Sequence, residues 1–347
     1  MPKLSVNLVV WNGAKYLPYL FDSLRKQNYQ DWELQILDNN STDNTIEIIE
    51  KEIINFPVSV RFFKEKENHG FAKGHNTLFA ESDDEYFLLL NQDMYLAEDC
   101  LEKMVDFLDK NPAVAAVSPR LMRWDFAKIN EGLFGSFSSQ IDALGLKVFR
   151  NRRVIEQYTG KNWEEIKNIF GSKDKMEVFG VSGAFPMYRR SVIKNVLFDN
   201  GQMLDESYQS YKEDVDLAYR LQASGYSSFI LLDTIAYHDR AGAGPKESGD
   251  LAALKNKKKH SPWVKYFSYR NHLATLYKNE RWQNFWLDFV FILWYELKKF
   301  VYFLIFEPKI LKGWADLMKE RKNLKSKRQE IKNKQKISWR DLRKWWK

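Results

Sequence analysis

Carboxylates stand at three places in this sequence where chemistry is expected. Asp38 and Asp93 each follow an apolar segment typical of a buried strand, and the pair Glu213-Asp214 opens a segment with helical spacing. In open α/β sheets, ligands bind at the carboxyl ends of the strands. We therefore expect these side chains to face a ligand site.

Asp38 has suitable chemistry for a nucleoside. A carboxylate at a strand end can accept the imide N–H of uracil or thymine, or bond a ribose hydroxyl. The alternative is a turn aspartate, because Asp38-Asn39-Asn40-Ser41 is also favourable turn chemistry.

Residues 68–76 form a second polar segment, with the sequence NHGFAKGHN. Its two glycines precede a predicted helix, and glycine lets the backbone approach a ligand closely. A plain loop is the alternative interpretation.

Asp93 could hold a divalent cation. It closes the sequence Asn91-Gln92-Asp93 just past a buried strand, and Mg²⁺ and Mn²⁺ prefer oxygen ligands. A diphosphate leaving group needs such charge neutralisation, and His238 could add a neutral imidazole ligand. The alternatives are a helix-capping aspartate and an ordinary surface or core histidine.

Glu213 and Asp214 are adjacent carboxylates at the start of a predicted helix. Two such groups are costly side by side unless one holds a proton or a cation. One of them can serve as a general base that takes a proton from an acceptor hydroxyl.

The segments around these residues alternate between strand-like and helix-like, which predicts an α/β fold with a mostly parallel sheet covered by helices. Predicted strands are residues 5–11, 33–37, 58–63, 86–90, 114–118, 178–188 and 229–232. Predicted helices are residues 17–27, 44–54 (capped by Ser41 or Thr42), 76–80, 97–110 and 214–223. We expect residues 121–178 to form an insert or loops near the acceptor site. The predicted domains are a catalytic domain at 1–245 and a helical region at 246–347.

Composition favours a folded protein of a reducing compartment. The chain has 347 residues, of which 44% are hydrophobic, enough for a sizeable core. Cys100 is the only cysteine, which excludes an intramolecular disulfide and a Cys-rich zinc site. The N-terminal sequence MPKLSVNLVVWNG lacks a small-residue cleavage site and predicts a core strand rather than a signal peptide.

The C-terminal region is first aromatic. Residues 285–306 are long enough to span a bilayer, but charged side chains interrupt them, and each costs about 2.5–3.5 kcal/mol at mid-span. These side chains are Asp288, Glu296, Lys298 and Lys299. We therefore expect two amphipathic helices on a membrane surface. The aromatic side chains predicted at headgroup depth are Trp282, Trp286, Trp294 and Tyr295.

The chain then becomes basic. Residues 309–347 contain 15 Lys/Arg and 4 Asp/Glu and end near Trp345-Trp346. Such a tail attracts anionic lipids by about 1 kcal/mol per well-placed charge, which predicts a peripheral protein on the cytoplasmic face of the plasma membrane. The alternative is that the aromatic region packs on the catalytic domain or on a second copy of the chain.

Two other protein classes fit the sequence poorly. The basic tail could bind nucleic acid, but the rest of the chain is near neutral and carries no nucleic-acid motif, so no such partner is expected. A dinucleotide-dependent oxidoreductase needs Gly-x-Gly-x-x-Gly, whereas the first predicted turn is Trp11-Asn12-Gly13-Ala14-Lys15.

Taken in order, the motifs of residues 4–240 resemble the inverting family 2 glycosyltransferases of GT-A fold, and most closely their bacterial rhamnosyltransferase-like branch. They are VVWNGAKYLPYLFDSL at 9–24, LDNNSTDNT at 37–45, ENHGFAKGHN at 67–76, LLLNQDMYL at 88–96, VSGAFPMYRRSVI at 181–193 and KEDVDLAYRLQASGY at 212–226. A weaker likeness continues at Tyr269-Arg270-Asn271.

The resemblance implies a role for each motif. It implies that Asp214 is the general base and that Asp93 and His238 hold Mg²⁺ or Mn²⁺. Asn91 replaces the first aspartate of the family's metal motif, which removes one charge and leaves a catalytically inactive scaffold as an alternative. The residues implied in donor or acceptor binding are Val10, Trp11, Asn12, Asp38, Asn68, Gly70, Asn76, Asn91, Ser182, Gly183, Ala184 and Glu213.

The implied reaction moves a sugar from a nucleoside diphosphate to a hydroxyl, with inversion at the anomeric carbon. The branch favours dTDP-L-rhamnose as donor, with UDP-galactofuranose, UDP-glucose and other UDP-hexoses as alternatives, because a few pocket contacts decide between sugars. From the aromatic and basic C-terminal region we expect a glycan or lipid-linked acceptor in cell-surface polysaccharide synthesis.

Overall fold

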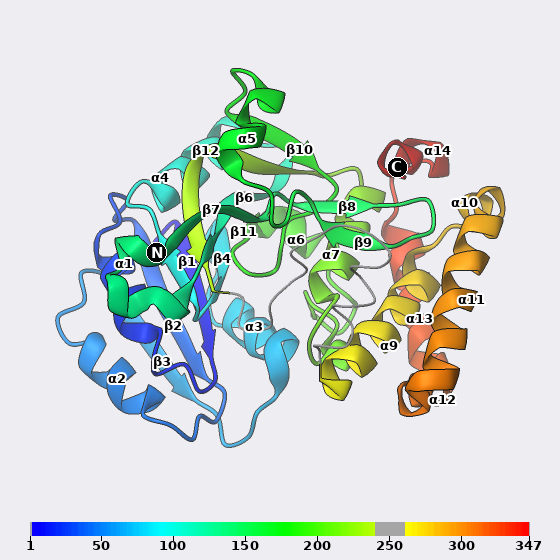
Figure 1. The fold of residues 1–347 in the computed structure, drawn as a ribbon, viewed down its shortest axis with the longest axis horizontal. Helices are drawn as coiled ribbons and strands as arrows, with labels where there is room; N and C mark the ends of the chain where they lie inside the picture. Colours follow the sequence, from blue (N-terminus) through cyan, green and yellow to red (C-terminus); the bar gives the residue numbers. More distant parts are fainter. Residues whose placement is uncertain (1, 240–260, 347) are drawn as a thin grey trace.

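The computed structural model describes residues 2–239 and 261–346, and a mixed β-sheet lies at its centre (Figure 1). The strand order is β10-β12-β6-β11-β4-β1-β2-β3, with β5 paired to β12 and β7 paired to β6. The strands are β1 Leu4–Val10, β2 Trp32–Asp38, β3 Val60–Lys64, β4 Tyr86–Asn91, β5 Met94–Leu96, β6 Val114–Trp124, β7 Phe137–Ala143, β10 Lys175–Val178, β11 Met187–Arg189 and β12 Ser227–His238. A separate hairpin consists of β8 (Leu146–Val148) and β9 (Val154–Glu156).

The larger strands of the sheet run in one direction. β3, β2, β1 and β4 pair in parallel, and β12 pairs in parallel with β6. The short strand β11 lies antiparallel between β4 and β6, so these two also point the same way. β1 and β2 are buried almost throughout, as expected for parallel strands covered on both faces. The predicted α/β fold is confirmed.

Helices cover both faces of the sheet. On one face, the core contains side chains of α1 (Leu17–Arg25), α2 (Thr45–Glu52) and α4 (Cys100–Lys110). On the other face, it contains side chains of α3 (Gly70–Ala80), α6 (Arg190–Lys194) and α7 (Glu213–Ala223).

The parallel register aligns the strand ends that matter for function. Val10 lies opposite Asp38 in the β1–β2 pair, and Val9 lies opposite Asn91 in the β1–β4 pair. The three strands therefore end at one edge of the sheet, where ligands bind in this type of fold.

Several element boundaries differ from the predicted ones. α3 begins at Gly70 rather than at residue 76, because the Asn68 side chain accepts a hydrogen bond of 2.8 Å from the Gly70 N–H where the helix starts. The predicted strand at 178–188 is instead β10, a loop and β11. β12 is longer than the predicted strand at 229–232, because β6 and β5 give it partners as far as His238.

The predicted cap of α2 is wrong. The helix begins at Thr45, and neither Ser41 nor Thr42 is its capping residue. The Ser41 hydroxyl instead accepts a hydrogen bond of 2.9 Å from the Asn12 N–H, and the Thr42 N–H donates to the Asn12 side chain at 2.8 Å. These side chains join the loops after β1 and β2.

Residues 121–178, predicted as an insert or loops, contain β7 to β10 and the short helix α5 (Trp163–Ile166). The insert is fixed to the C-terminal region by Arg152, which has no exposed surface. Its guanidinium donates to Glu280 at 2.7 and 2.8 Å and to Asp288 at 3.0 Å.

The C-terminal region forms a group of helices beside α7, on one side of the molecule (Figure 1). They are α9 Pro262–Asn279, α10 Trp282–Leu287, α11 Phe289–Phe306, α12 Lys312–Lys319, α13 Arg321–Lys334 and α14 Trp339–Leu342. The predicted domain boundary between residues 245 and 246 lies outside the described residues.

Asp288 separates α10 from α11, so the apolar stretch forms two helices, as predicted. Its carboxylate is buried and accepts hydrogen bonds from Arg150, Arg152 and Arg343, each at 3.0 Å. Within residues 2–239 and 261–346, no helix combines the length and apolarity needed to cross a bilayer.

α11 directs charged side chains inward and apolar side chains outward. Glu296 contacts the buried His272 of α9 at 2.7 Å and also pairs with Lys299 at 3.3 Å. In contrast, Trp294 is 61% exposed and Ile305 is 64% exposed. A surface helix of a globular protein usually buries its apolar stripe and exposes its charged side chains. The orientation of α11 is the opposite.

The end of the basic tail packs on the catalytic domain. Trp346 is buried against Phe179 and Tyr219, and the Trp345 indole donates to Gln222 at 2.9 Å. Trp345 and Trp346, aromatic side chains that would also suit a membrane interface, therefore pack instead on the side of α7 that carries Val215, Ala218 and Tyr219.

Candidate functional site

Asp38 ends β2 and is fully buried. Its Oδ2 accepts a hydrogen bond of 3.0 Å from the Ser41 N–H. Its Oδ1 has no hydrogen-bond partner within the described part of the chain. A buried acceptor without a partner is costly, so this atom can accept an N–H or O–H from a ligand.

Val10, Trp11 and Asn12 form the neighbouring loop after β1. The side chain of Gln92 accepts from the Trp11 N–H at 2.8 Å and donates to the Trp11 carbonyl at 3.1 Å. This contact fixes the loop and leaves the Trp11 indole 53% exposed at the strand ends. Gln92 was not among the residues predicted for the site, although it lies within the predicted motif.

Gly13 makes room for the contact between the Gln92 side chain and the Trp11 backbone. A Cβ at Gly13 would lie 2.5 Å from Oε1 of Gln92, which is shorter than atoms tolerate. Only glycine at this position lets the Gln92 side chain reach the backbone of Trp11.

Asn68 and Gly70 lie at the start of α3, where the loop meets the segment before α7. The Phe71 N–H donates to the Gln209 carbonyl at 3.0 Å, and Gly70 has a φ of +80°. A Cβ at Gly70 would lie 2.6 Å from that same carbonyl, so glycine is required here.

Asn76 lies on the buried face of α3 rather than in a loop. Its amide donates to the Leu204 carbonyl at 2.8 Å and to Glu206 at 2.9 Å, and its oxygen accepts from the N–H groups of Met203 and Leu204. The structure thus uses Asn76 to fix the segment before Asp214, and not as a loop residue beside Asn68.

Asp93 and His238 come together from different elements, as expected. Nε2 of His238 lies 3.3 Å from Oδ1 of Asp93, and the two backbones are joined through β12 and β5. The other ring nitrogen, Nδ1, donates to Oδ2 of Asp142 at 2.9 Å. Asp142 is fully buried in β7 and was not predicted as a site residue.

The pair Asp93–His238 fits a divalent cation. Burial lowers the pKa of His238, but the charge of Asp93 and the hydrogen bonds to Asp142 and Asp93 outweigh it and raise the pKa to about 10. The same negative surroundings favour a divalent cation, which would take the place of the proton on Nε2, because a histidine ligand must be neutral. Adjacent ligand atoms of an octahedral ion lie about 3 Å apart, which is close to the observed 3.3 Å.

The protein would supply few ligands to such an ion. Among the residues that the structure describes, no group of three or more His, Cys, Asp or Glu side chains could enclose a metal. Mg²⁺ and similar ions are often held by one or two carboxylates together with substrate phosphates and water. Asp93 and His238 therefore fit a cation that is completed by a diphosphate.

Asp214 lies in the first turn of α7. One loop connects it to the end of β4, which precedes Asp93. The Gly183 N–H donates to Oδ2 of Asp214 at 3.1 Å. The Ala184 carbonyl accepts from the Asn91 N–H at 3.1 Å. The segment Ser182, Gly183 and Ala184 thus lies between the predicted base and the end of β4.

Glu213 is buried beside Asp214, and its Oε2 has no hydrogen-bond partner in the described structure. Burial, and then the charge of Asp214, raise the pKa of Glu213 to about 8. Glu213 therefore keeps its proton near neutral pH in the folded protein.

A family comparison identifies the class of protein to which this fold belongs. Residues 5–197, more than half of the chain, match the model of Glycosyl transferase family 2. The chain belongs to this family.

Curated relatives support the same class. An uncharacterized glycosyltransferase of Haemophilus influenzae is 35% identical over 114 residues, 33% of this chain and 45% of the relative. The poly(ribitol-phosphate) β-N-acetylglucosaminyltransferase TarS of Staphylococcus aureus is 30% identical over 115 residues, 32% of this chain and 20% of the relative. The matched part of the chain thus spans less than half of each of these relatives.

Solved structures share the fold. GalNAc-T7 with UDP, GalNAc and Mn²⁺ superposes with a TM-score of 0.58 and 12% identity, covering 80% of this chain and 48% of the other. Residues 1–349 of Staphylococcus aureus TarS with UDP-GlcNAc give a TM-score of 0.55 and 17% identity, covering 95% and 91%. At these identities the likeness concerns the fold alone.

Proposed function

We propose that this protein is an inverting glycosyltransferase that moves a sugar from a UDP- or dTDP-linked donor to a hydroxyl of a glycan or lipid-linked acceptor. One observation carries the proposal. A single loop contacts Asp214 through Gly183 and the end of β4 through Ala184, so it joins the base to the side that carries Asp93. A base on one side and a diphosphate site on the other is the arrangement that an in-line displacement needs.

In the proposed reaction, Asp214 takes the proton of an acceptor hydroxyl. The resulting oxygen attacks the anomeric carbon from the face opposite the diphosphate, and the bond to the diphosphate breaks, which inverts that carbon. Asp93 and His238 would hold a Mg²⁺ or Mn²⁺ ion, whose charge stabilises the leaving diphosphate. A positioned base contributes about 10²–10⁴-fold to such a rate.

We assign recognition of the donor's nucleobase to Asp38. Its Oδ1 is buried and lacks a partner among the described residues, which suits the imide N–H of uracil or thymine. Trp11 follows Val10, which lies opposite Asp38 in the β1–β2 pair, and its indole is exposed enough to stack on a nucleobase. We propose dTDP-L-rhamnose as the first donor to test, with UDP-galactofuranose and UDP-hexoses beside it.

We also propose that the protein works on the cytoplasmic face of the plasma membrane, in cell-wall or cell-surface polysaccharide synthesis. The outward apolar face of α10 and α11 supports this: Trp282, Trp286 and Trp294 are 61–66% exposed. Tryptophan prefers the interface between headgroups and acyl chains. Basic side chains of the neighbouring α12 add attraction to anionic lipid, for example Lys319, whose side chain is 76% exposed.

A thermal-shift screen tests the donor site. The purified protein is heated with UDP-, dTDP-, GDP- and CMP-sugars, with and without Mn²⁺, because ligands of the folded state raise the melting temperature. We expect selective, metal-dependent stabilisation by UDP- or dTDP-sugars. Equal behaviour of all four classes would contradict the assignment of Asp38 to the base.

A further inference from the structure

The backbone just before the base has an unusual conformation. Gln209, Tyr211 and Lys212 have φ angles of 59°, 71° and 73°. Side chains other than glycine rarely adopt this left-handed region, and each such residue costs about 1 kcal/mol or more unless its surroundings hold it there. Asp214 follows two residues later, so its position depends on this segment.

Asn271 of α9 holds the segment. Its side-chain Nδ2 lies 2.9 Å from the carbonyl of Tyr208, 2.9 Å from that of Ser210 and 2.8 Å from that of Tyr211. Three carbonyls thus converge on one amide that carries two hydrogens. Asn271 has no exposed surface, so water cannot replace this donor.

Arg270 fixes the orientation of the Asn271 amide. Nη1 of Arg270 donates to Oδ1 of Asn271 at 2.9 Å and to the Ser207 carbonyl at 2.9 Å. The amide cannot flip, because a flip would turn its oxygen toward the three carbonyls and its NH₂ group toward the guanidinium.

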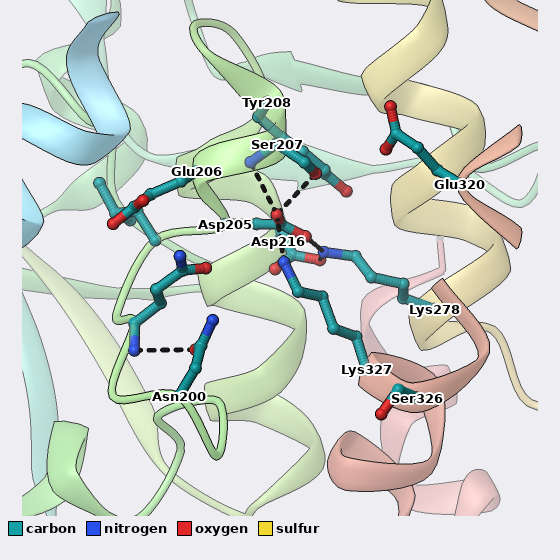
Figure 2. Close-up of polar contacts among 12 residues, drawn as sticks. Asn200, Asp205, Glu206, Ser207, Tyr208, Asp216, Lys278, Glu320, Ser326 and Lys327 are labelled. Atoms are coloured by element: carbon teal, nitrogen blue, oxygen red, sulfur yellow. Dashed lines mark hydrogen bonds and ion pairs between the residues drawn. The ribbon is translucent and has the colours of Figure 1, made fainter. Parts of the chain in front are cut away.

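The rest of the same face of α9 continues the contact. Thr275 and the Tyr208 hydroxyl are 2.8 Å apart, and Asn279 donates to Asp216 at 2.8 Å. Figure 2 shows Lys278 and Lys327 pointing at Asp205 and Asp216 from the C-terminal helices. These positions, 271, 275, 278 and 279, lie on one face because helical neighbours are three and four residues apart.

We propose that Asn271 is a positioning residue for the base, and this inference rests on the proposed role of Asp214. The amide anchors residues 208–211 and so maintains the left-handed φ values of Gln209, Tyr211 and Lys212, which place Asp214 beside the Gly183 N–H. Loss of the amide removes one donor from three carbonyls at once, and the segment then relaxes toward ordinary φ values. Asp38, Asp93 and His238 lie on other elements, and none of the hydrogen bonds described for them involves residues 208–211, so these three side chains keep their geometry. The segment does contact the start of α3, where the Phe71 N–H donates to the Gln209 carbonyl.

The test compares Asn271→Ala with Asn284→Ala. Asn284 is a matched control because it is also a buried asparagine of the C-terminal region, but it donates to the Trp339 carbonyl, away from the base. We expect Asn271→Ala to lower kcat by about 10²-fold, the cost of an ångström-scale misplacement. The KM for the donor should stay within about threefold of the parent, because Asp38, Asp93 and His238 make none of the contacts that the substitution removes. Asn284→Ala should keep the parental kcat at temperatures where both variants are folded.

Equal kcat values for the two variants would overturn the proposal, as would a loss confined to KM. If Asn271→Ala does not fold, Asn271→Ser removes the reach of the side chain while keeping a hydroxyl, and the same comparison applies.

Hydrogen exchange separates this inference from the proposed function. We expect the amides of residues 208–215 to exchange at least tenfold faster in Asn271→Ala than in Asn284→Ala, because the segment loses its support. This result would stand even if the parent protein transferred no sugar, which would refute the proposed function alone. Unchanged exchange in that segment would refute the role of Asn271.

Discussion

Asp142 holds the imidazole of His238 through a hydrogen bond of 2.9 Å between Oδ2 and Nδ1, and both side chains are buried. This bond keeps a proton on Nδ1, so that loss of the Nε2 proton would leave the Nε2 lone pair free for a cation beside Asp93. A carboxylate behind a histidine ligand fixes the tautomer of the ring and raises its basicity. Asp142 would therefore orient His238 in the proposed metal site.

Asp142→Asn should weaken binding of Mn²⁺ about 10–100-fold, because removal of such a supporting carboxylate has this effect on metal sites. The measurement is a titration of Mn²⁺ in the presence of UDP, followed by the rise in melting temperature. Asp125→Asn is the control, since the Asp125 side chain is half exposed and pairs with the exposed Lys128. The same Mn²⁺ affinity in both variants would show that His238 needs no support.

Glu213→Gln should change how stability depends on pH. The pKa of Glu213 is raised from 4.5 to about 8 in the folded protein. Between these values the folded chain keeps a proton that the unfolded chain releases, so stability falls as the pH rises through this window. Glutamine does not ionise, so the variant avoids this fall in stability. Near pH 8.5 it should be more stable than the parent by about 1–3 kcal/mol. Near pH 4.5 it should have no such advantage.

Melting temperatures of both proteins across this range check the prediction. The control is Glu47→Gln on the exposed side of α2, for which we expect parallel curves. A Glu213→Gln curve parallel to that of the parent would mean that Glu213 is ionised when folded.

Lys278→Met should destabilise the protein by about 3–5 kcal/mol, the usual effect of removing one partner from a buried ion pair. Lys278 has no exposed side-chain surface and pairs with Asp205 and Asp216. The charge of Lys278, together with that of Lys327, holds the pKa of Asp205 below its usual range although burial raises it. Without Lys278, the buried carboxylates of Asp205 and Asp216 would lose a positive charge that they share.

Chemical denaturation measures this change. Lys194→Met serves as the control, because the Lys194 and Asp83 side chains are 57% and 72% exposed, and such pairs contribute about 1 kcal/mol or less. A loss as small as that of the control would show that water reaches the Lys278 cluster.

Ile305→Glu should reduce binding to vesicles that contain anionic lipid by about tenfold or more, because burial of an isoleucine in the interface contributes roughly 1.5–3 kcal/mol. Co-sedimentation with such vesicles is the measurement. Ile54→Glu is a close control: Ile54 is 66% exposed and Ile305 is 64% exposed, but Ile54 lies beyond α2, away from the C-terminal helices. Equal binding of both variants would remove α11 from the proposed membrane surface.

The structure also changes how the C-terminal tail can be studied. Lys327 and Trp346 are buried against the catalytic domain. Deletion of residues 309–347 would therefore remove part of the core, and single substitutions on α11 and α12 are the appropriate probes of lipid binding.

Sequence patterns located the strand-end residues because their signal is local. Asp38 and Asp93 each follow an apolar run, and the parallel register then brings the strand ends together. Asp142 carries no such signal: it lies 96 residues from His238 in a segment without clear periodicity. Its contact depends on β6, which pairs with both β7 and β12.

Asn271 shows the same limit. The motif Tyr269-Arg270-Asn271 was visible, but its contacts lie about 60 residues earlier in the chain, at 208–211. Neither spacing nor composition predicts which loop α9 will meet. Likewise, the charged side chains of α11 predict a helix at a surface but not which side faces outward. Glu296 contacts the buried His272, so the charged side faces inward and the apolar side faces outward.

The most direct test of the account is Asp214→Asn, measured for sugar transfer and for donor binding on the same preparation. The variant keeps the shape of the side chain but cannot accept the proton. We expect transfer to fall by about 10²–10⁴-fold, while the affinity for the nucleotide-sugar with Mn²⁺ changes by less than about threefold. Transfer at the parental rate would contradict the assignment of Asp214 as the base and, with it, the proposed mechanism.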